Sequence, residues 1–143
     1  MHPSEYRARL LRILTMRSEE VAAKLRRFRD AATDAVVIDL FVGQDGEGPF
    51  DVWVRFEGAD AFALDRRFDD ERHIFGVVWG EEGWEPDVPS RPRGWSGEEL
   101  EEATFETVAA WLEPLIPEGG PSWELTSVDG VSEPRRLGAH ADR

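Results

Sequence analysis

Apolar side chains recur in the first thirty residues at spacings of three, four and seven, which is the pattern of an amphipathic helix. The pattern predicts helix over residues 4–32, with Ser4 as the N-cap. Ser18 interrupts the apolar stripe, so the segment is either one long helix or two helices that break near Arg17–Ser18. The stripe consists of Tyr6, Leu10, Leu14, Val21, Leu25, Phe28 and Ala32.

From residue 35 onward the apolar period changes from 3.6 to 2, which favours strands. AVVIDLFV (35–42) and DVWVRFE (51–57) are expected to form an antiparallel hairpin across a glycine-rich connection. AFALDR (61–66) and HIFGVVWG (73–80) are expected to be a third and a fourth strand. In the second strand the alternation predicts two faces, one with Val52, Val54 and Phe56, the other with Asp51, Trp53, Arg55 and Glu57.

A second helix is predicted after residue 96. Ser96 and Glu99 fit a capping box, in which each side chain bonds the other residue's backbone amide. Pro114 and Pro117 are expected to end the helix. SWELTSV (122–128) alternates as a last strand, and residues 131–143 are expected to be a flexible C-terminal tail.

This order of elements predicts a single α+β domain over residues 1–130. The expected architecture is a two-layer sandwich with an antiparallel, four- to five-stranded sheet. A long N-terminal helix and a second helix would cover one face of the sheet, because each amphipathic stripe must be buried. The other face, with Trp53 and Arg55, would be solvated or available to a partner.

Charge narrows the classes of partner. The 143 residues carry a formal net charge of −13, although residues 1–29 alone carry +5. Such acidity disfavours binding to nucleic acid or to anionic lipid. The chain has no cysteine, no long apolar run and no signal-peptide pattern, so we expect a cytoplasmic protein without disulfides.

Three tryptophans fall in a segment, WGEEGWEPDVPSRPRGW (79–95), that is too rich in glycine, proline and charge to predict helix or strand. Trp79 ends a predicted strand and Trp95 directly precedes a predicted helix, so both rings can pack against those elements. Trp84 is therefore the ring expected to be accessible. Aromatic anchors inside an acidic rim suit a basic protein surface. The predicted partner-binding residues are Trp53, Trp79, Glu81, Glu82, Trp84, Glu85, Asp87 and Trp95.

Candidate catalytic chemistry is limited to His73, the one histidine inside a predicted element. With Asp69 or Asp70 as its partner it could serve as a general base in a small hydrolase or transferase. No phosphate-loop, zinc or nucleophile motif is present, and no cofactor is expected. Asp45, Glu47 and Asp51 form a weak alternative site for a metal such as Ca²⁺, although their glycines do not match an EF-hand loop.

Across most of its length, and especially in EGPFDVW, FGVVWGEEGWEP and RPRGW, the chain resembles an uncharacterised family of small acidic bacterial proteins. Its format is similar to the immunity proteins of bacterial toxin systems, which are small, acidic, cysteine-free and rich in tryptophan. The resemblance implies a noncatalytic protein that neutralises or regulates a basic partner, such as a toxin. A monomer and a dimer, including a secretion-chaperone-like dimer, both fit this format.

Overall fold

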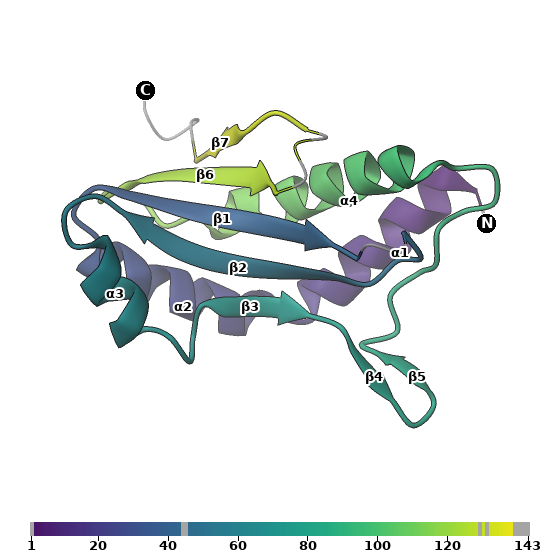
Figure 1. The fold of residues 1–143 in the computed structure, drawn as a ribbon, viewed down its shortest axis with the longest axis horizontal. Coiled ribbons are helices and arrows are strands. Elements are labelled where there is room, and N and C mark those ends of the chain that lie inside the picture. The colour runs from purple at the N-terminus through teal and green to yellow at the C-terminus, as the bar shows by residue number, and fades with distance from the viewer. Residues whose placement is uncertain (1, 44–45, 129, 131, 139–143) are drawn as a thin grey trace.

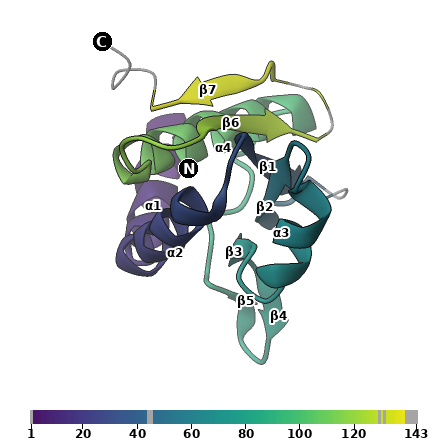
Figure 2. The same cartoon turned by 90° about the vertical axis from the view of Figure 1, so that its left-hand side faces the viewer.

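The structure is a computed structural model that describes residues 2–43, 46–128, 130 and 132–138. It is an α+β fold built on a five-stranded sheet, with a separate two-stranded hairpin (Figure 1). Helices α1 (Pro3–Thr15), α2 (Ser18–Ala31) and α4 (Gly97–Leu112) lie on one side of the sheet (Figures 1 and 2). The α+β class predicted from the sequence is therefore confirmed.

The N-terminal segment is two helices, so the expected single long helix is wrong, and the break falls near Ser18, where the alternative placed it. Helix α1 ends at Thr15 and α2 begins at Ser18, whose hydroxyl accepts a hydrogen bond from the Trp111 indole Nε1 at 3.0 Å. The break thus ties the two helices to α4, which packs along α1. The buried stripe of both helices is the predicted one except for Ala32, which is the half-buried C-cap of α2; it consists of Tyr6, Leu10, Leu14, Val21, Leu25 and Phe28.

The main sheet has the order β3-β2-β1-β6-β7, formed by β1 (Ala35–Val42), β2 (Phe50–Glu57), β3 (His73–Gly76), β6 (Ser122–Ser127) and β7 (Arg135–Leu137). Strands β1 and β2 form the predicted antiparallel pair. Strand β6, however, lies parallel to β1, so the sheet is mixed and the antiparallel prediction is wrong at this pair. The cause is connectivity: the chain returns through α4 and enters the sheet beside β1 in the same direction (Figure 1).

The helical side of the sheet is the hydrophobic core. Alternate residues of β1 and β2, such as Ile38 and Val54, are fully buried beneath the helices. Phe28 of α2 makes edge-to-face contacts with Phe56 and Phe68, at ring-centroid distances of 5.5 and 5.2 Å. The opposite face, which we call the outer face, carries the polar alternates of the same strands, among them Asp39, Asp51, Trp53, Arg55 and Thr126.

Two predicted strands differ in the structure. Residues 61–66, expected as a strand, lie in helix α3 (Ala61–Arg67), whose Leu64 is its buried residue. The Asp65 carboxylate accepts a hydrogen bond from the backbone amide of Phe56 at 3.0 Å, which holds α3 against β2. The run 73–80 divides at Val77: its first half is β3, and its second half is β4 (Val78–Gly80), which leaves the main sheet.

The C-terminal part is more ordered than the sequence predicts. Strand β7 lies inside the segment expected to be a flexible tail and pairs antiparallel with β6. Its Leu137 is buried, and Gly138 donates its amide hydrogen to the Glu113 carboxylate at 3.0 Å. The 3₁₀ helix η1 (Glu113–Leu115) that follows α4 therefore meets the end of β7. The sheet thus extends past residue 130, through residues 135–137.

Candidate partner-binding surface

A short hairpin, β4 with β5 (Gly83–Glu85), extends away from the main sheet (Figures 1 and 2). Strand β4 lies within the predicted strand 73–80, whereas residues 83–85 were expected to form neither helix nor strand. Gly83 allows the hairpin, because its φ of +125° is a conformation that favours glycine. Trp79 and Trp84 face each other across the two strands in register. The hairpin thereby brings together two of the three predicted loop tryptophans.

Trp79 is the accessible ring of this pair. It is 78% exposed, and its neighbour Val78 is 61% exposed. Trp84 is half-buried because it packs over Gly48, where an added Cβ would lie 3.2 Å from the indole ring. The expectation that Trp84 is the accessible ring is therefore wrong, and Trp79 takes that place.

Acidic residues follow Trp79 and Trp84 closely along the chain. Glu81, Glu82, Glu85 and Asp87 are all exposed. Glu82, Glu85 and Asp87 line an open hollow of about 310 Å³ together with Trp84 and Pro86. We call the set of Val78, Trp79, Glu81, Glu82, Trp84, Glu85 and Asp87 the hairpin surface.

The other two predicted anchors lie elsewhere. Trp95 packs edge-on against Tyr6, with ring centroids 5.3 Å apart, and is half-buried beside the start of α4. There Ser96 and Glu99 form the predicted capping box, with hydrogen bonds of 3.1 and 3.0 Å. Trp53 lies on the outer face of the main sheet. Neither ring is part of the hairpin surface.

His73 is positioned by groups that differ from those expected. Its Nε2 lies 2.8 Å from the Asp51 carboxylate, and its ring stacks on Trp53 with centroids 4.4 Å apart. Gly76 makes room for this pair, because an added Cβ there would collide with the imidazole. The His73 side chain is 37% exposed.

Asp69 and Asp70 are not the partners of His73. The Asp69 carboxylate accepts a hydrogen bond from Arg72 at 3.1 Å, and Asp70 is exposed. The sequence brought these carboxylates close to His73 only along the chain. The cross-strand register of β2 and β3 determines the actual partner, Asp51.

Sequence reasoning missed a charged group at the centre of the outer face. The nearly buried Asp39 carboxylate accepts hydrogen bonds from Arg55 at 2.8 Å and from the Thr126 hydroxyl at 2.5 Å. Burial lowers the pKa of the Arg55 guanidinium, but Asp39 and Glu57 outweigh it and raise that pKa above its ordinary value. The signal was the single aspartate within the apolar strand AVVIDLFV, since a buried charge requires a partner.

The weak metal site is not assembled among the residues described. Asp45 lies outside the described residues, and Asp51 holds His73 instead. Within the described ranges, no three His, Cys, Asp or Glu side chains converge closely enough to hold an ion. In the same part of the chain, no helix has the length and apolarity needed to cross a bilayer.

The fold and its surfaces define an α+β domain that has a mixed sheet and an exposed, acidic, aromatic hairpin. The chain belongs to the family of unknown function DUF6389, whose model matches residues 1–141. No curated protein and no solved structure matches the chain. The expected membership of an uncharacterised family is thereby confirmed.

Proposed function

We propose that this protein is a noncatalytic binding module that captures a basic protein partner through the hairpin surface. The observation that carries the proposal is the exposure of Trp79 on an element that extends away from the fold. Because its size, acidity and tryptophan content resemble those of immunity proteins, we expect the protein to neutralise or regulate that partner, which could be a toxin.

The exposed ring supplies the affinity. A tryptophan that becomes buried at an interface removes roughly 150–250 Å² from water, worth about 4–6 kcal/mol before binding costs are subtracted. The backbone of Trp79 is already held in a strand pair opposite Trp84, so docking costs mainly the rotamer freedom of the indole side chain. Val78, which is next to it and also exposed, extends the apolar contact.

The acidic rim supplies the selectivity. Glu81 and Glu82 occupy the turn of the hairpin, and Glu85 and Asp87 follow it. Their negative charge adds to a chain of net charge −13, which accelerates encounter with a positively charged surface and repels an acidic one. Lysine and arginine side chains of a partner could also stack on the indole rings.

Comparative capture from a lysate of the host tests the proposal. Wild-type protein, Trp79→Ala and Phe62→Ala serve as three baits, and bound proteins are quantified by mass spectrometry. Phe62 is a matched control because it is 74% exposed on α3, away from the hairpin surface. We expect a basic protein that is retained by the wild type and by Phe62→Ala but lost with Trp79→Ala.

The affinity for that partner then gives a quantitative test. Loss of a tryptophan hot spot costs about 2 kcal/mol or more, which weakens Kd roughly 30-fold. Neutralising Glu81, Glu82 and Glu85 to glutamine should slow association and reduce the salt dependence of binding. Failure to recover a basic protein, or equal recovery with all three baits, would refute the proposal.

A further inference from the structure

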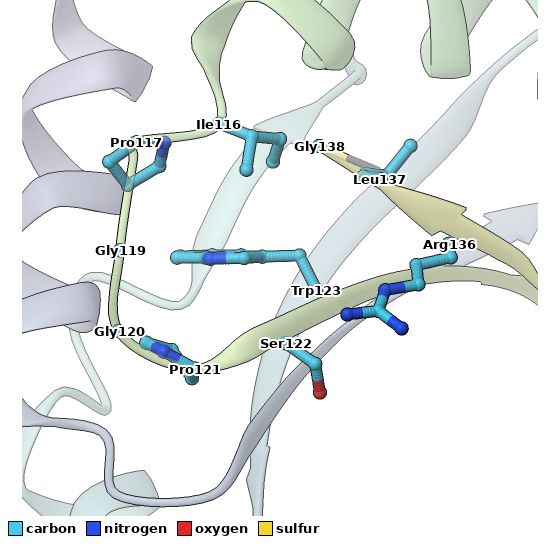
Figure 3. Close-up of a pocket in the computed structure, with 10 residues that line it drawn as sticks. All are labelled: Ile116, Pro117, Gly119, Gly120, Pro121, Ser122, Trp123, Arg136, Leu137 and Gly138. Carbon is cyan, nitrogen blue, oxygen red and sulfur yellow. The ribbon is translucent and has the colours of Figure 1, made fainter. Parts of the chain in front are cut away.

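A second recessed site lies at the opposite end of the sheet from the hairpin surface, where β6 begins and β7 ends (Figure 1). It has a volume of about 120 Å³ and is enclosed by the loop after η1 and by the two strands. Figure 3 shows the indole of Trp123 extending from β6 toward this loop. The lining residues are Ile116, Pro117, Gly119, Gly120, Pro121, Ser122, Trp123, Arg136, Leu137 and Gly138.

The indole N–H of Trp123 is the unusual feature of this site. Trp123 is only 3% exposed, and its Nε1 is buried without a hydrogen-bond partner among the described residues. A buried donor without a partner has lost its hydrogen bond to water and gained none in exchange, which is unfavourable. By contrast, the buried Nε1 of Trp111 bonds the Ser18 hydroxyl. Among the described residues only Arg72 Nε shares this condition, and it does not lie in the lining of this hollow, so Trp123 supplies the buried donor that remains free for a ligand here.

Two glycines shape the loop that borders the site. Gly119 and Gly120 both have positive φ values, +74° and +77°, which favour glycine. A Cβ at Gly119 would meet no atom within 4 Å, whereas one at Gly120 would lie 2.6 Å from Cγ of Arg29. The loop is thus packed against α2 on one side and unobstructed on the other.

The chemistry of the lining selects the ligand. The Trp123 indole and the Arg136 guanidinium can only donate hydrogen bonds, and none of the ten lining residues is acidic. We propose that this hollow, which we call the Trp123 site, binds a small carboxylate, with one oxygen accepting the Trp123 N–H and Arg136 supplying positive charge at the rim. The volume has room for several waters, which matches a small organic acid and excludes a nucleotide.

Titration with sodium acetate and sodium lactate, followed by the indole N–H resonances in ¹⁵N NMR, tests this assignment. The six tryptophans give six such resonances, and the Trp123 signal is the one lost in Trp123→Phe. We expect both salts to shift that signal to saturation, whereas sodium chloride and acetamide at equal concentration should shift it little. The wild-type protein is used throughout as the reference.

Two variants separate the contribution of the Trp123 N–H to binding from that of the Arg136 charge. Trp123→Phe keeps an apolar ring but removes the N–H, so acetate binding should weaken about tenfold or more, as for a lost bond to a charged group. Because this variant lacks the Trp123 signal, its binding is followed by the backbone amide signals of the lining residues Gly119 and Ser122, which are titrated in the wild type as well. Arg136→Gln should weaken binding of acetate, while the small shift caused by neutral acetamide should stay as it is in the wild type. Trp79→Phe, the matched control at an exposed ring, should bind acetate as the wild type does.

Three outcomes would overturn the proposal. They are a Trp123 signal that does not saturate with either carboxylate, an equal shift with sodium chloride, and unchanged affinity in Trp123→Phe. If Trp123→Phe does not fold, the remaining five indole signals will reveal it, and Arg136→Gln then decides the question. Neither result depends on the hairpin surface, so the two proposals stand or fall separately.

Discussion

Tyr6, the only tyrosine of the chain, belongs to α1 and is fully buried. Its hydroxyl contacts α4 and therefore offers a direct test of how the two helices are joined. The Tyr6 and Thr104 oxygens are 2.9 Å apart. Thr104 uses its one hydroxyl hydrogen to bond the Leu100 carbonyl at 2.8 Å. Tyr6 must therefore donate to Thr104, and only its neutral form can do so.

Because Tyr6 is the donor, removing its hydroxyl and removing the Thr104 hydroxyl should lower the stability of the fold by different amounts. Tyr6→Phe removes a donor and leaves Thr104 still bonded to Leu100, so we expect a loss of about 1 kcal/mol. Thr104→Val leaves the buried Tyr6 hydroxyl without an acceptor, which should cost about 1–3 kcal/mol. For a domain of this size each kcal/mol lowers Tm by about 3–4 °C.

The same geometry predicts a loss of stability at alkaline pH. Burial raises the pKa of the Tyr6 hydroxyl above its ordinary value of 10.0, and the nearby positive charge of Arg7 opposes this to a smaller extent. Above that pH the unfolded chain releases the tyrosine proton while the folded chain retains it. The stabilisation is therefore complete below pH 10.0 and is lost as pH rises from there through the folded pKa.

Urea denaturation of wild type and Tyr6→Phe, at neutral pH and at a series of alkaline pH values, measures this contribution. The difference between the two proteins isolates Tyr6, because Lys24 and the arginines titrate in both. Tyrosinate absorbance of the folded wild type reports the same group directly, since there is one tyrosine. Parallel alkaline curves for both proteins, or ordinary ionisation of Tyr6 in the folded state, would refute the reasoning.

Two further substitutions test local structure by chemical denaturation. Ser96→Ala removes half of the α4 capping box and should cost about 1 kcal/mol, whereas Ala at the exposed loop residue Ser90 should cost almost nothing. Gly76→Ala places a methyl against His73 and within 2.7 Å of Asp51, so it should cost about 1–3 kcal/mol and shift the His73 ring signals in NMR. Gly97→Ala, where a Cβ meets nothing within 4 Å, is its control, and equal costs at residues 76 and 97 would contradict the proposed crowding.

Sequence patterns predicted well wherever a signal is local. The stripe of α1 and α2, the break at Ser18, the alternation of β2 and the capping box of α4 all depend on residues within one or two turns of each other. The same holds for the acidic character of the hairpin surface, because Glu81, Glu82 and Glu85 are adjacent in sequence. Local periodicity is a physical consequence of which face must be buried.

The secondary structure of short segments was ambiguous, because so few residues do not define a period. In residues 61–66, Phe62 and Leu64 alternate as in a strand, yet only Leu64 is buried and Phe62 points into solvent on α3. A segment of this length fits either period, and its docking on β2 through Asp65 decides between them. The hairpin of β4 and β5 is similar, since three-residue strands carry almost no periodic signal.

The sequence by itself determined the secondary structure of the long elements, the burial of their apolar faces and the charge of the surface. Only the tertiary structure decided that β6 runs parallel to β1, that Trp84 is covered by packing over Gly48 while Trp79 is exposed, and that His73 meets Asp51. These features arise from contacts between residues far apart in the chain. Hydrophobic periodicity specifies which side of an element is buried, but not which element buries it.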